Sequence, residues 1–386
     1  MIAIIDSFRF GEEHAPFNAA FIDIVNKCFP DEKTEIYIQK EHWKIIYDIL
    51  NQNSGPDSDR TFEILKGIDS KNGTLSLFLS YLICTFQDTK VLFKSNSKLF
   101  FYTTANPLAL FFIKLVNLLL RKRVYVVLHG ELEYLNKGND KSLKLQTRLL
   151  RQWYRLIFWK FLTRNFSYIL LGESIRSNLK SLKPSNFPNS NFITIDHPYF
   201  FKTGLQKSES FVPLNLGIVG HSAEVKGSHK IFELAELNDS EISNGKMKFK
   251  IIGHISNCIL KYQNKLVETP SRNDFLPRTE YEKEISSLHY ILFFYPNSMY
   301  QYIASGAFFD AISFEKPIIA LRNSFFEHYF NRYGEIGYLC DSLEEMSYYL
   351  SNINLERYNL QLQNIKQAKK DLSLENISQR LRSQLI

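Results

Sequence analysis

Cysteine is scarce in this sequence, and the four cysteines are far apart. No two of Cys28, Cys84, Cys258 and Cys340 form a Cys-X-X-Cys pair. Such spacing fits neither structural zinc sites nor the disulfide frameworks of small secreted proteins. We therefore expect reduced thiols in a cytoplasmic protein that has no metal site and needs no cofactor.

Long hydrophobic runs are also missing. Residues 1–13 carry no basic region, no long apolar stretch and no small-residue cleavage site, so they predict a first strand rather than a signal peptide. The most apolar segment, residues 107–120, contains Lys114 and is too short to cross a bilayer. We expect a protein of the cytoplasm, or one held peripherally on the inner face of the cytoplasmic membrane.

No arm of the chain concentrates the positive charge, although the net charge is +7. Because the basic residues are spread out, a phosphorylated ligand or an anionic membrane surface suits them better than nucleic acid. The sequence contains no short repeat and no low-complexity tract, and its 45% apolar residues are typical of a globular chain. A length of 386 residues predicts two domains, since one hydrophobic core rarely serves so long a chain.

Short apolar runs alternate with helical patterns along the whole chain. Strands are predicted at 2–5, 35–39, 61–65, 98–104, 123–129, 167–172, 191–196, 214–220, 248–254, 265–268, 290–295, 316–321 and 335–340. Helices are predicted near 15–28, 75–87, 107–121, 143–164, 173–182, 228–238, 279–288, 306–314, 324–332 and 342–353, before a polar helical tail. Continuous apolar strands separated by helices are typical of an α/β protein with doubly wound parallel sheets.

Residues 197–213 are the best linker candidate, because they combine prolines at both ends with a glycine and several polar residues. This linker predicts an N-terminal domain over residues 1–200 and a C-terminal domain over 201–360. The helical tail, 361–386, is expected to pack back on the N-terminal domain. Ligands of open α/β sheets bind beyond the carboxyl ends of the strands, so two such domains would face a central cleft.

One loop in the second half combines glycines with a lysine. In LGIVGHSAEVKGSHKIFELAE, residues 216–236, Gly220 ends a predicted strand, and Lys226 and Gly227 close the loop before the next helix. A helix start offers unpaired N–H groups and partial positive charge, to which Lys226 adds a full charge and His221 a further donor. This pattern favours a bound anion, although a solvated loop lysine remains the alternative.

A second stretch, residues 293–321, predicts a strand, a long loop, a helix and another strand. Ser305 and Gly306 open that helix, so their N–H groups also suit an anion. Asp310 lies one turn into the helix, where its carboxylate can accept hydrogen bonds from two vicinal hydroxyls such as those of a ribose. The alternative for Asp310 is a first-turn acid that is favoured only by the helix dipole.

Residues 214–321 resemble the donor-nucleotide domain of GT-B glycosyltransferases, especially the group-1/family-4-like enzymes of bacterial surface-polysaccharide synthesis. The resemblance is carried by GIVGHSAEVKGSHK, LPRTEYEKEISSLHYILFFYP and SGAFFDAISFEKPIIA, in that order. It implies a GT-B fold of two Rossmann-like domains, the first binding the acceptor and the second the nucleotide-sugar donor. It also implies that Lys226 holds the donor diphosphate, within a donor site made of Gly220, His221, Lys226, Ser305, Gly306 and Asp310.

The sequence departs from this family at two positions. The family often has two glutamates with seven residues between them, and the matching residues here are Tyr302 and Asp310, so the first carboxylate is missing. The family also often has arginine where His221 stands, which would leave less positive charge beside the phosphates.

The first half matches the family more loosely. RVYVVLHGELEYL resembles the strand that ends in a cleft-facing histidine, which makes His129 and Glu131 the predicted catalytic partners of Lys226. The loop after the first strand, residues 6–21, resembles the acceptor loop, and its candidate acceptor-binding residues are Arg9, Glu12, Glu13 and His14. A core histidine and solvated loop charges are the alternatives for these residues.

Residues 143–166 predict a basic amphipathic helix. Arg148, Arg151 and Arg155 are spaced along one side, and Leu149 and Trp153 belong to another. This pattern suits an anionic membrane surface, while a helix packed on its own sheet with a solvated basic side is the alternative.

Together these patterns predict glycosyl transfer from a nucleotide-diphosphate sugar to a hydroxyl of a glycan or lipid-linked glycan acceptor. The resemblance favours synthesis of O-antigen, capsule or exopolysaccharide, with retained anomeric configuration and without a metal. An inverting route would need a general base, for which Glu131, Glu12, Glu13 and His129 are candidates. The alternatives are a nucleotide-sugar 2-epimerase of the same fold and a non-catalytic glycan- or membrane-binding module.

Overall fold

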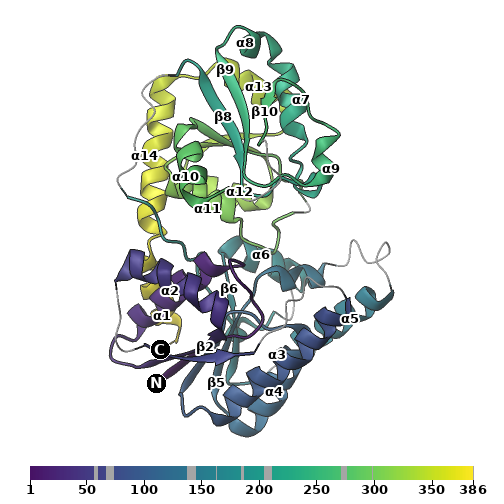
Figure 1. Ribbon diagram of the computed structural model, residues 1–386, viewed down its shortest axis with the longest axis vertical. Coiled ribbons are helices and arrows are strands. Elements are labelled where there is room, and N and C mark those ends of the chain that lie inside the picture. The colour runs from purple at the N-terminus through teal and green to yellow at the C-terminus, as the bar shows by residue number, and fades with distance from the viewer. Residues whose placement is uncertain are drawn as a thin grey trace. The chain divides into compact units, whose positions relative to one another are not determined.

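The chain divides into two compact units, each built on its own parallel sheet (Figure 1). Unit 1 comprises Met1–Phe200 and Ser373–Ile386, and unit 2 comprises Phe201–Leu372. The structure is a computed structural model. It describes residues 1–55, 60–66, 74–136, 145–161, 163–183, 187–203, 211–270, 276–297 and 299–385. Parts of the predicted linker (204–210) and of the predicted amphipathic helix (143, 144 and 162) lie outside the described residues.

Unit 1 contains a seven-stranded parallel sheet in the order β3-β2-β1-β4-β5-β6-β7. Its strands are β1 (Ile2–Asp6), β2 (Thr34–Gln39), β3 (Arg60–Leu65), β4 (Leu99–Tyr102), β5 (Arg123–Val127), β6 (Phe166–Leu170) and β7 (Phe192–Thr194). Its helices are α1 (Ala15–Cys28), α2 (Lys40–Ser54), α3 (Thr74–Lys94), α4 (Pro107–Leu120), α5 (Leu145–Lys160), α6 (Glu173–Leu182) and α15 (Leu374–Leu385). The chain runs outward from β1 to β3 and then returns to β4 beside β1, so the switch point of this sheet lies between β1 and β4.

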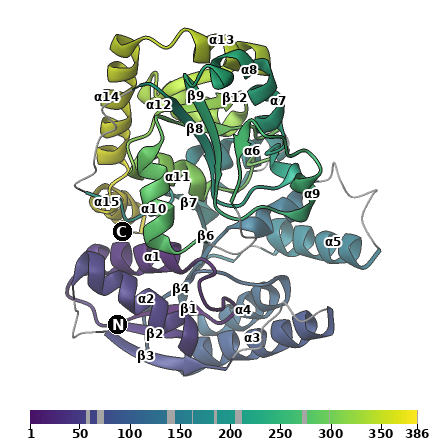
Figure 2. The same cartoon turned by 45° about the horizontal axis from the view of Figure 1, so that its top comes forward.

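The helices of unit 1 form layers on the two faces of this sheet. α1 packs against α2 and α15, and on the other face α3 packs against α4 and α4 against α5 (Figure 2). Right-handed crossovers explain this division, because the direction of travel across the sheet reverses after β3. With helices on both faces, all five residues of β1 are buried, as the continuous apolar run of the sequence predicts.

The C-terminal helix α15 belongs to unit 1. Its Gln384 side chain bonds both the N–H and the C=O of Thr194 on β7, at 3.0 and 2.8 Å, and Arg380 forms a 2.5 Å ion pair with Asp196. The preceding helix, α14 (Leu355–Asp371), belongs to unit 2. The division between the units therefore falls within the predicted tail, after Leu372, rather than at its expected start near residue 361.

Unit 2 contains a six-stranded parallel sheet in the order β10-β9-β8-β11-β12-β13. Its strands are β8 (Leu214–Val219), β9 (Met247–Ile252), β10 (Val267–Glu268), β11 (Tyr290–Phe293), β12 (Ile318–Leu321) and β13 (Gly337–Cys340). Its other helices are α7 (Lys230–Leu237), α8 (Asp239–Ser243), α9 (Asn257–Leu260), α10 (Arg278–Ser287), α11 (Gly306–Ser313), α12 (Ser324–Tyr333) and α13 (Leu343–Ser351). The switch point of this sheet lies between β8 and β11.

The predicted α/β class with doubly wound parallel sheets is confirmed. The sequence pattern did not indicate α2, and it extended several strands too far at their carboxyl ends. The strand predicted at 123–129, for example, ends at Val127, which places His129 in irregular backbone beyond the sheet edge. None of the helices in the described ranges is long and apolar enough to cross a membrane.

Candidate active site

The switch point of unit 2 carries the lysine loop. After β8, the chain passes through Gly220 and a short 3-10 turn, Glu224–Lys226, before α7 begins at Lys230. A small pocket at the ends of β8 and β11 is lined by Lys226, Phe294 and Tyr295, among others. The loop that the sequence singled out therefore lies where a doubly wound sheet binds its ligand.

Gly227 fits this loop closely against the neighbouring strand end. Its φ angle is 71°, in the left-handed region, and a Cβ atom at this position would lie 2.3 Å from the carbonyl oxygen of Phe294. Only glycine meets both conditions without moving the backbone. The Lys-Gly pair is thus explained by packing, because Gly227 lets the loop approach β11 and so fixes the position of Lys226.

Within the described part of the chain, no carboxylate balances the charge of Lys226. Its ammonium donates to the carbonyl oxygen of His221 at 3.1 Å, and the ion pairs of the described residues include none with Lys226. The His221 ring lies 2.6 Å from the Ser256 hydroxyl. Burial, followed by the charges of Lys226 and His254, lowers the pKa of His221. This edge therefore holds the Lys226 cation beside His221, whose neutral form that cation favours. A bound anion would be stabilised by the positive charge of Lys226.

The start of α11 borders the same edge. Ser305 caps the helix, since its hydroxyl accepts a hydrogen bond from the N–H of Phe308 at 3.3 Å. The hydroxyl of Tyr295, which also lines the Lys226 pocket, lies 3.0 Å from the Ser305 hydroxyl. The Ser305 side chain is buried, whereas Gly306 is exposed. The structure thus connects the Lys226 loop to the α11 start through Tyr295, and leaves the main chain of Gly306 accessible.

Asp310 lies one turn into α11 and is held by α10. Its carboxylate accepts a hydrogen bond from the Tyr281 hydroxyl at 2.9 Å, and the Arg278 guanidinium lies 3.9 Å away. The same Tyr281 hydroxyl is close to Gly220, since a Cβ atom added to that glycine would lie 3.9 Å from it. Gly220, Tyr281 and Asp310 are therefore neighbours, which brings the predicted donor residues of unit 2 to one edge of the sheet.

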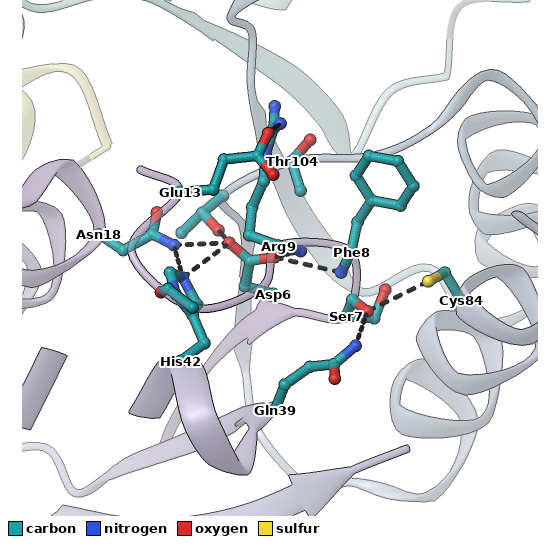
Figure 3. Close-up of polar contacts among 12 residues, drawn as sticks. Asp6, Ser7, Phe8, Arg9, Glu13, Asn18, Gln39, His42, Cys84 and Thr104 are labelled. Carbon is teal, nitrogen blue, oxygen red and sulfur yellow. Dashed lines mark hydrogen bonds and ion pairs between the residues drawn. The ribbon is translucent and has the colours of Figure 1, made fainter. Parts of the chain in front are cut away.

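The switch point of unit 1 is organised by Asp6 (Figure 3). One carboxylate oxygen accepts the main-chain N–H groups of Phe8 and Arg9, at 3.2 and 3.0 Å. The other accepts the Asn18 amide at 2.6 Å and the Thr103 hydroxyl at 2.8 Å. Asp6 is the last residue of β1 and Thr103 follows β4, so this buried carboxylate fixes the loop after β1 to the neighbouring strand of the sheet.

His42 completes the Asp6 network from α2. Its Nδ1 lies 2.6 Å from the carbonyl oxygen of Gly11, and its Nε2 lies 2.9 Å from the Asn18 amide nitrogen. Because a carbonyl can only accept, Nδ1 carries the proton and Nε2 accepts from Asn18. One ring nitrogen thereby holds Gly11 of the loop after β1, and the other holds Asn18 on α1.

The predicted acceptor and catalytic residues of unit 1 meet beside this network. Arg9 pairs with Glu13 and lies 3.8 Å from Glu131. Glu131 also accepts the Thr104 hydroxyl and the main-chain N–H of His129, both at 3.0 Å. Arg9, Glu13, His129 and Glu131 are therefore assembled into one group. Glu12 and Glu13 are both exposed in this loop, and of the two it is Glu13 that pairs with Arg9.

Two histidines of this group contact Phe17, and a third contacts one of those two. The His129 ring lies 4.8 Å from His14 and 4.4 Å from Phe17, and His197 lies 5.0 Å from Phe17, between ring centroids. Burial lowers the pKa of His14 to about 3 and that of His197 to about 4. Burial, with His14 and Arg9, lowers the pKa of His129 well below its usual range. Neutral imidazoles can donate and accept hydrogen bonds, but His129 is a weak general base here.

Several residues of these two edges were missed by sequence reasoning: Asp6, Asn18, His42, Thr103, Thr104, His197, His254, Ser256 and Tyr281. Asp6 carried a usable signal, since it is an acid at the end of an apolar strand. His42 and Asn18 carried none, because each lies within a helix. Among the described residues, no cluster of three or more His, Cys, Asp or Glu side chains could hold a metal ion.

Comparison with known proteins finds likeness in structure alone. No known family model and no curated protein matches the sequence. HepE of Anabaena in complex with UDP-glucose is similar at a TM-score of 0.64 and 12% identity, covering 100% of this chain and 98% of that chain. TarM is similar at a TM-score of 0.63 and 13% identity, covering 100% of this chain and 97% of that chain. A putative UDP-N-acetylglucosamine 2-epimerase from Listeria monocytogenes is similar at a TM-score of 0.54 and 13% identity. The match covers 94% of this chain and 90% of that chain.

Proposed function

We propose that this chain, which has the GT-B fold and is similar in structure to HepE and TarM, transfers a sugar from a nucleotide-diphosphate donor to a glycan hydroxyl. The observation that carries the proposal is Lys226, a cation without a carboxylate partner among the described residues, at the switch point of unit 2. A doubly wound sheet binds its ligand at that point, and a lone cation there favours an anionic ligand. The donor diphosphate supplies that anion.

The donor site is suited to the departure of a nucleoside diphosphate. Breaking the anomeric bond builds an oxocarbenium-like centre and leaves negative charge on the diphosphate. The Lys226 ammonium and the main-chain N–H groups at Gly306 provide positive charge that is in place before the reaction, which is the most effective form of transition-state stabilisation. With this charge supplied by the chain, we propose transfer that does not require a metal. Asp310 would bind the ribose, and in doing so would exchange its Tyr281 partner for ribose hydroxyls.

The acceptor would bind at the edge of unit 1. Arg9, Glu13 and Glu131 offer charged hydrogen-bonding groups, and His14 and His129 offer neutral ones, which together suit the hydroxyls of a sugar. The low basicity of His129 argues against its removing the acceptor proton, which leaves the retaining route, with the departing phosphate as base, as our proposal. Glu131, fixed by two hydrogen bonds, is the carboxylate available to an inverting route.

The acceptor class is proposed from the resemblance to bacterial surface-polysaccharide enzymes. We expect a glycan or lipid-linked glycan of O-antigen, capsule or exopolysaccharide synthesis, met in the cytoplasm at the inner face of the membrane. The exposed Gly306 and the half-buried Lys226 would leave the donor accessible to such a large acceptor.

A second candidate is a nucleotide-sugar 2-epimerase, which the likeness to the putative Listeria enzyme favours. Such an enzyme would convert its sugar nucleotide without an acceptor. Incubating the protein with the donor alone, and following the C2 configuration by NMR, separates the two candidates. An epimerised sugar nucleotide in the absence of acceptor would replace the transfer proposal.

The proposal is tested by screening nucleotide sugars for a rise in melting temperature, because a ligand that binds only the folded chain stabilises it by mass action. The best donor is then tested against Lys226→Ala. The matched control is Lys246→Ala, which removes an exposed lysine whose partner is Glu241. We expect the shift to disappear in Lys226→Ala alone. No shift with any sugar nucleotide in the parent protein would favour a non-catalytic module.

A further inference from the structure

The helix layer formed by α3, α4 and α5 has an apolar outer side. More than half of the exposed large apolar side chains in the described residues belong to these three helices. They are Leu75, Phe78, Leu79, Leu82, Phe86 and Phe93 on α3, Phe112, Leu115, Leu118 and Leu119 on α4, and Leu145, Leu149, Trp153 and Leu156 on α5. Leu119 is 85% exposed and Leu75 is 72% exposed. We refer to these fourteen side chains as the apolar helix face.

The apolar helix face is continuous across neighbouring helices. The exposed residues recur three or four positions apart, so each helix presents one apolar stripe. α3 packs against α4 and α4 against α5, and the helices lie side by side in Figure 1. The rings of Phe111 on α4 and Trp153 on α5 are 5.1 Å apart, and Phe111 also contacts Phe112. A contiguous apolar area of this kind marks an interaction surface in a soluble chain.

The layer is held rigid by a buried lysine. Lys114 on α4 is fully buried, and its ammonium donates to the carbonyl oxygens of Ile157 and Phe161 at 3.0 and 2.6 Å. These carbonyls lie at the end of α5 and just beyond it, where a helix leaves such groups without partners. Lys114 therefore ties α5 to α4, so that the outer stripes of the two helices keep a fixed relation.

The charge of this layer has one sign. The sequences of α3, α4 and α5 contain a single acidic residue, Asp88, which is buried. Lys90, Lys94, Arg148 and Lys160 are exposed on the same helices. The layer therefore presents an apolar surface with basic residues and no exposed carboxylate.

We propose that the apolar helix face docks on an anionic lipid bilayer. Apolar side chains with a central tryptophan suit the boundary between headgroups and acyl chains, and the exposed lysines and arginine suit anionic headgroups. A second copy of the chain fits less well, because pairing two such faces would bring basic residues together without acids to balance them. The proposal concerns unit 1 alone and does not depend on the transfer reaction.

The test is co-sedimentation of the full chain with vesicles. We expect binding to phosphatidylcholine vesicles that contain about 30% phosphatidylglycerol, and at least about tenfold weaker binding to pure phosphatidylcholine. Leu119→Glu and Leu149→Glu should each lower binding to the anionic vesicles by about tenfold, since each puts an acid into the apolar contact. The matched control is Leu355→Glu, which changes a 59% exposed leucine on α14 of unit 2 and should bind like the parent.

Each other outcome overturns the proposal. Absence of binding to anionic vesicles would do so, as would equal losses in Leu119→Glu and Leu355→Glu. Sedimentation velocity provides a further arm, because a dimer that Leu119→Glu dissociates would assign the face to a second copy. An unchanged urea-unfolding curve for Leu119→Glu, followed by the fluorescence of the tryptophans of unit 1, verifies that the variant is folded there. Loss of vesicle binding with intact donor binding concerns only this surface and leaves the proposed reaction standing.

Discussion

The carboxyl edges of the two sheets are built in opposite ways. In unit 1, Asp6 makes four hydrogen bonds and the nearby histidines are held neutral by burial. In unit 2, the half-buried Lys226 donates to a main-chain carbonyl and forms no ion pair with a carboxylate among the described residues. The first edge is a prearranged network of hydrogen bonds and ion pairs, which we propose receives hydroxyls, and the second carries an unbalanced cation, which we propose receives phosphate. Both sheets are doubly wound, so the difference between their edges comes from the loops at the switch points.

The largest expected effect concerns the stability of unit 1 against acid. The folded-state pKa values of His14, His129 and His197 are lowered, so below about pH 6.5 the unfolded chain binds more protons than the folded chain. Their contribution to stability is complete above about pH 6.5 and is lost as the pH falls toward the folded-state values. A histidine that stays neutral at about pH 5 lowers the free energy of unfolding by about 2 kcal/mol over that range. With His14 and His197 partly exposed, we expect about 4 kcal/mol for the three together.

Urea unfolding followed by tryptophan fluorescence measures this effect in unit 1 alone, because Trp43, Trp153 and Trp159 all lie there. His197→Gln should make the pH dependence less steep. His328→Gln, in unit 2, is the control and should leave it unchanged. A free energy of unfolding that stays constant between about pH 6.5 and about pH 5 would refute neutral burial of these histidines.

Gly227→Ala should have the next largest effect, and it acts on unit 2. The new methyl group would meet the Phe294 carbonyl oxygen and force a left-handed φ on alanine, so the loop must move. We expect a loss of about 2 kcal/mol in stability and a larger than tenfold loss in donor affinity. Gly245→Ala is the control, since it shares a positive φ but has no atom within 4 Å of the added Cβ. Equal donor affinity in the two variants would show that the close packing of Gly227 does not position Lys226.

His129→Ala should separate the two edges functionally. Because His129 lies in unit 1, its loss should lower acceptor transfer by about tenfold or more while donor-nucleotide affinity stays near that of the parent. Initial rates give the first quantity and calorimetry the second. If both fall together, His129 acts through the fold and not through the acceptor.

The smallest expected effect is a proton taken up by His221 on donor binding. In the free protein, burial and Lys226 lower the pKa of this imidazole, and a bound diphosphate would oppose the Lys226 contribution. The affinity should therefore rise by a few fold as the pH falls from about 8 to about 6. Calorimetry in buffers of different ionisation enthalpy counts the proton, and His221→Gln should abolish its uptake. Uptake that persists in His221→Gln would assign it elsewhere.

The sequence was most informative where a feature depends on neighbouring residues. The strands were predictable because burial on both faces gives continuous apolar runs, and the Lys226 loop because glycines flank it. The Asp6, Asn18 and His42 network was not, since it joins a strand end to two helices that are distant in sequence. Likewise, nothing local pairs Tyr281 with Asp310, because that contact exists only once α10 packs beside α11.

The central claim is that Lys226 binds the diphosphate of the donor. The most direct test measures two affinities, those of the donor's nucleoside diphosphate and of the nucleoside alone, for the parent protein and for Lys226→Ala. The account predicts that the variant loses about tenfold or more for the diphosphate, at least about 1.4 kcal/mol, and almost nothing for the nucleoside. An equal loss for both ligands, or no loss for either, would contradict it.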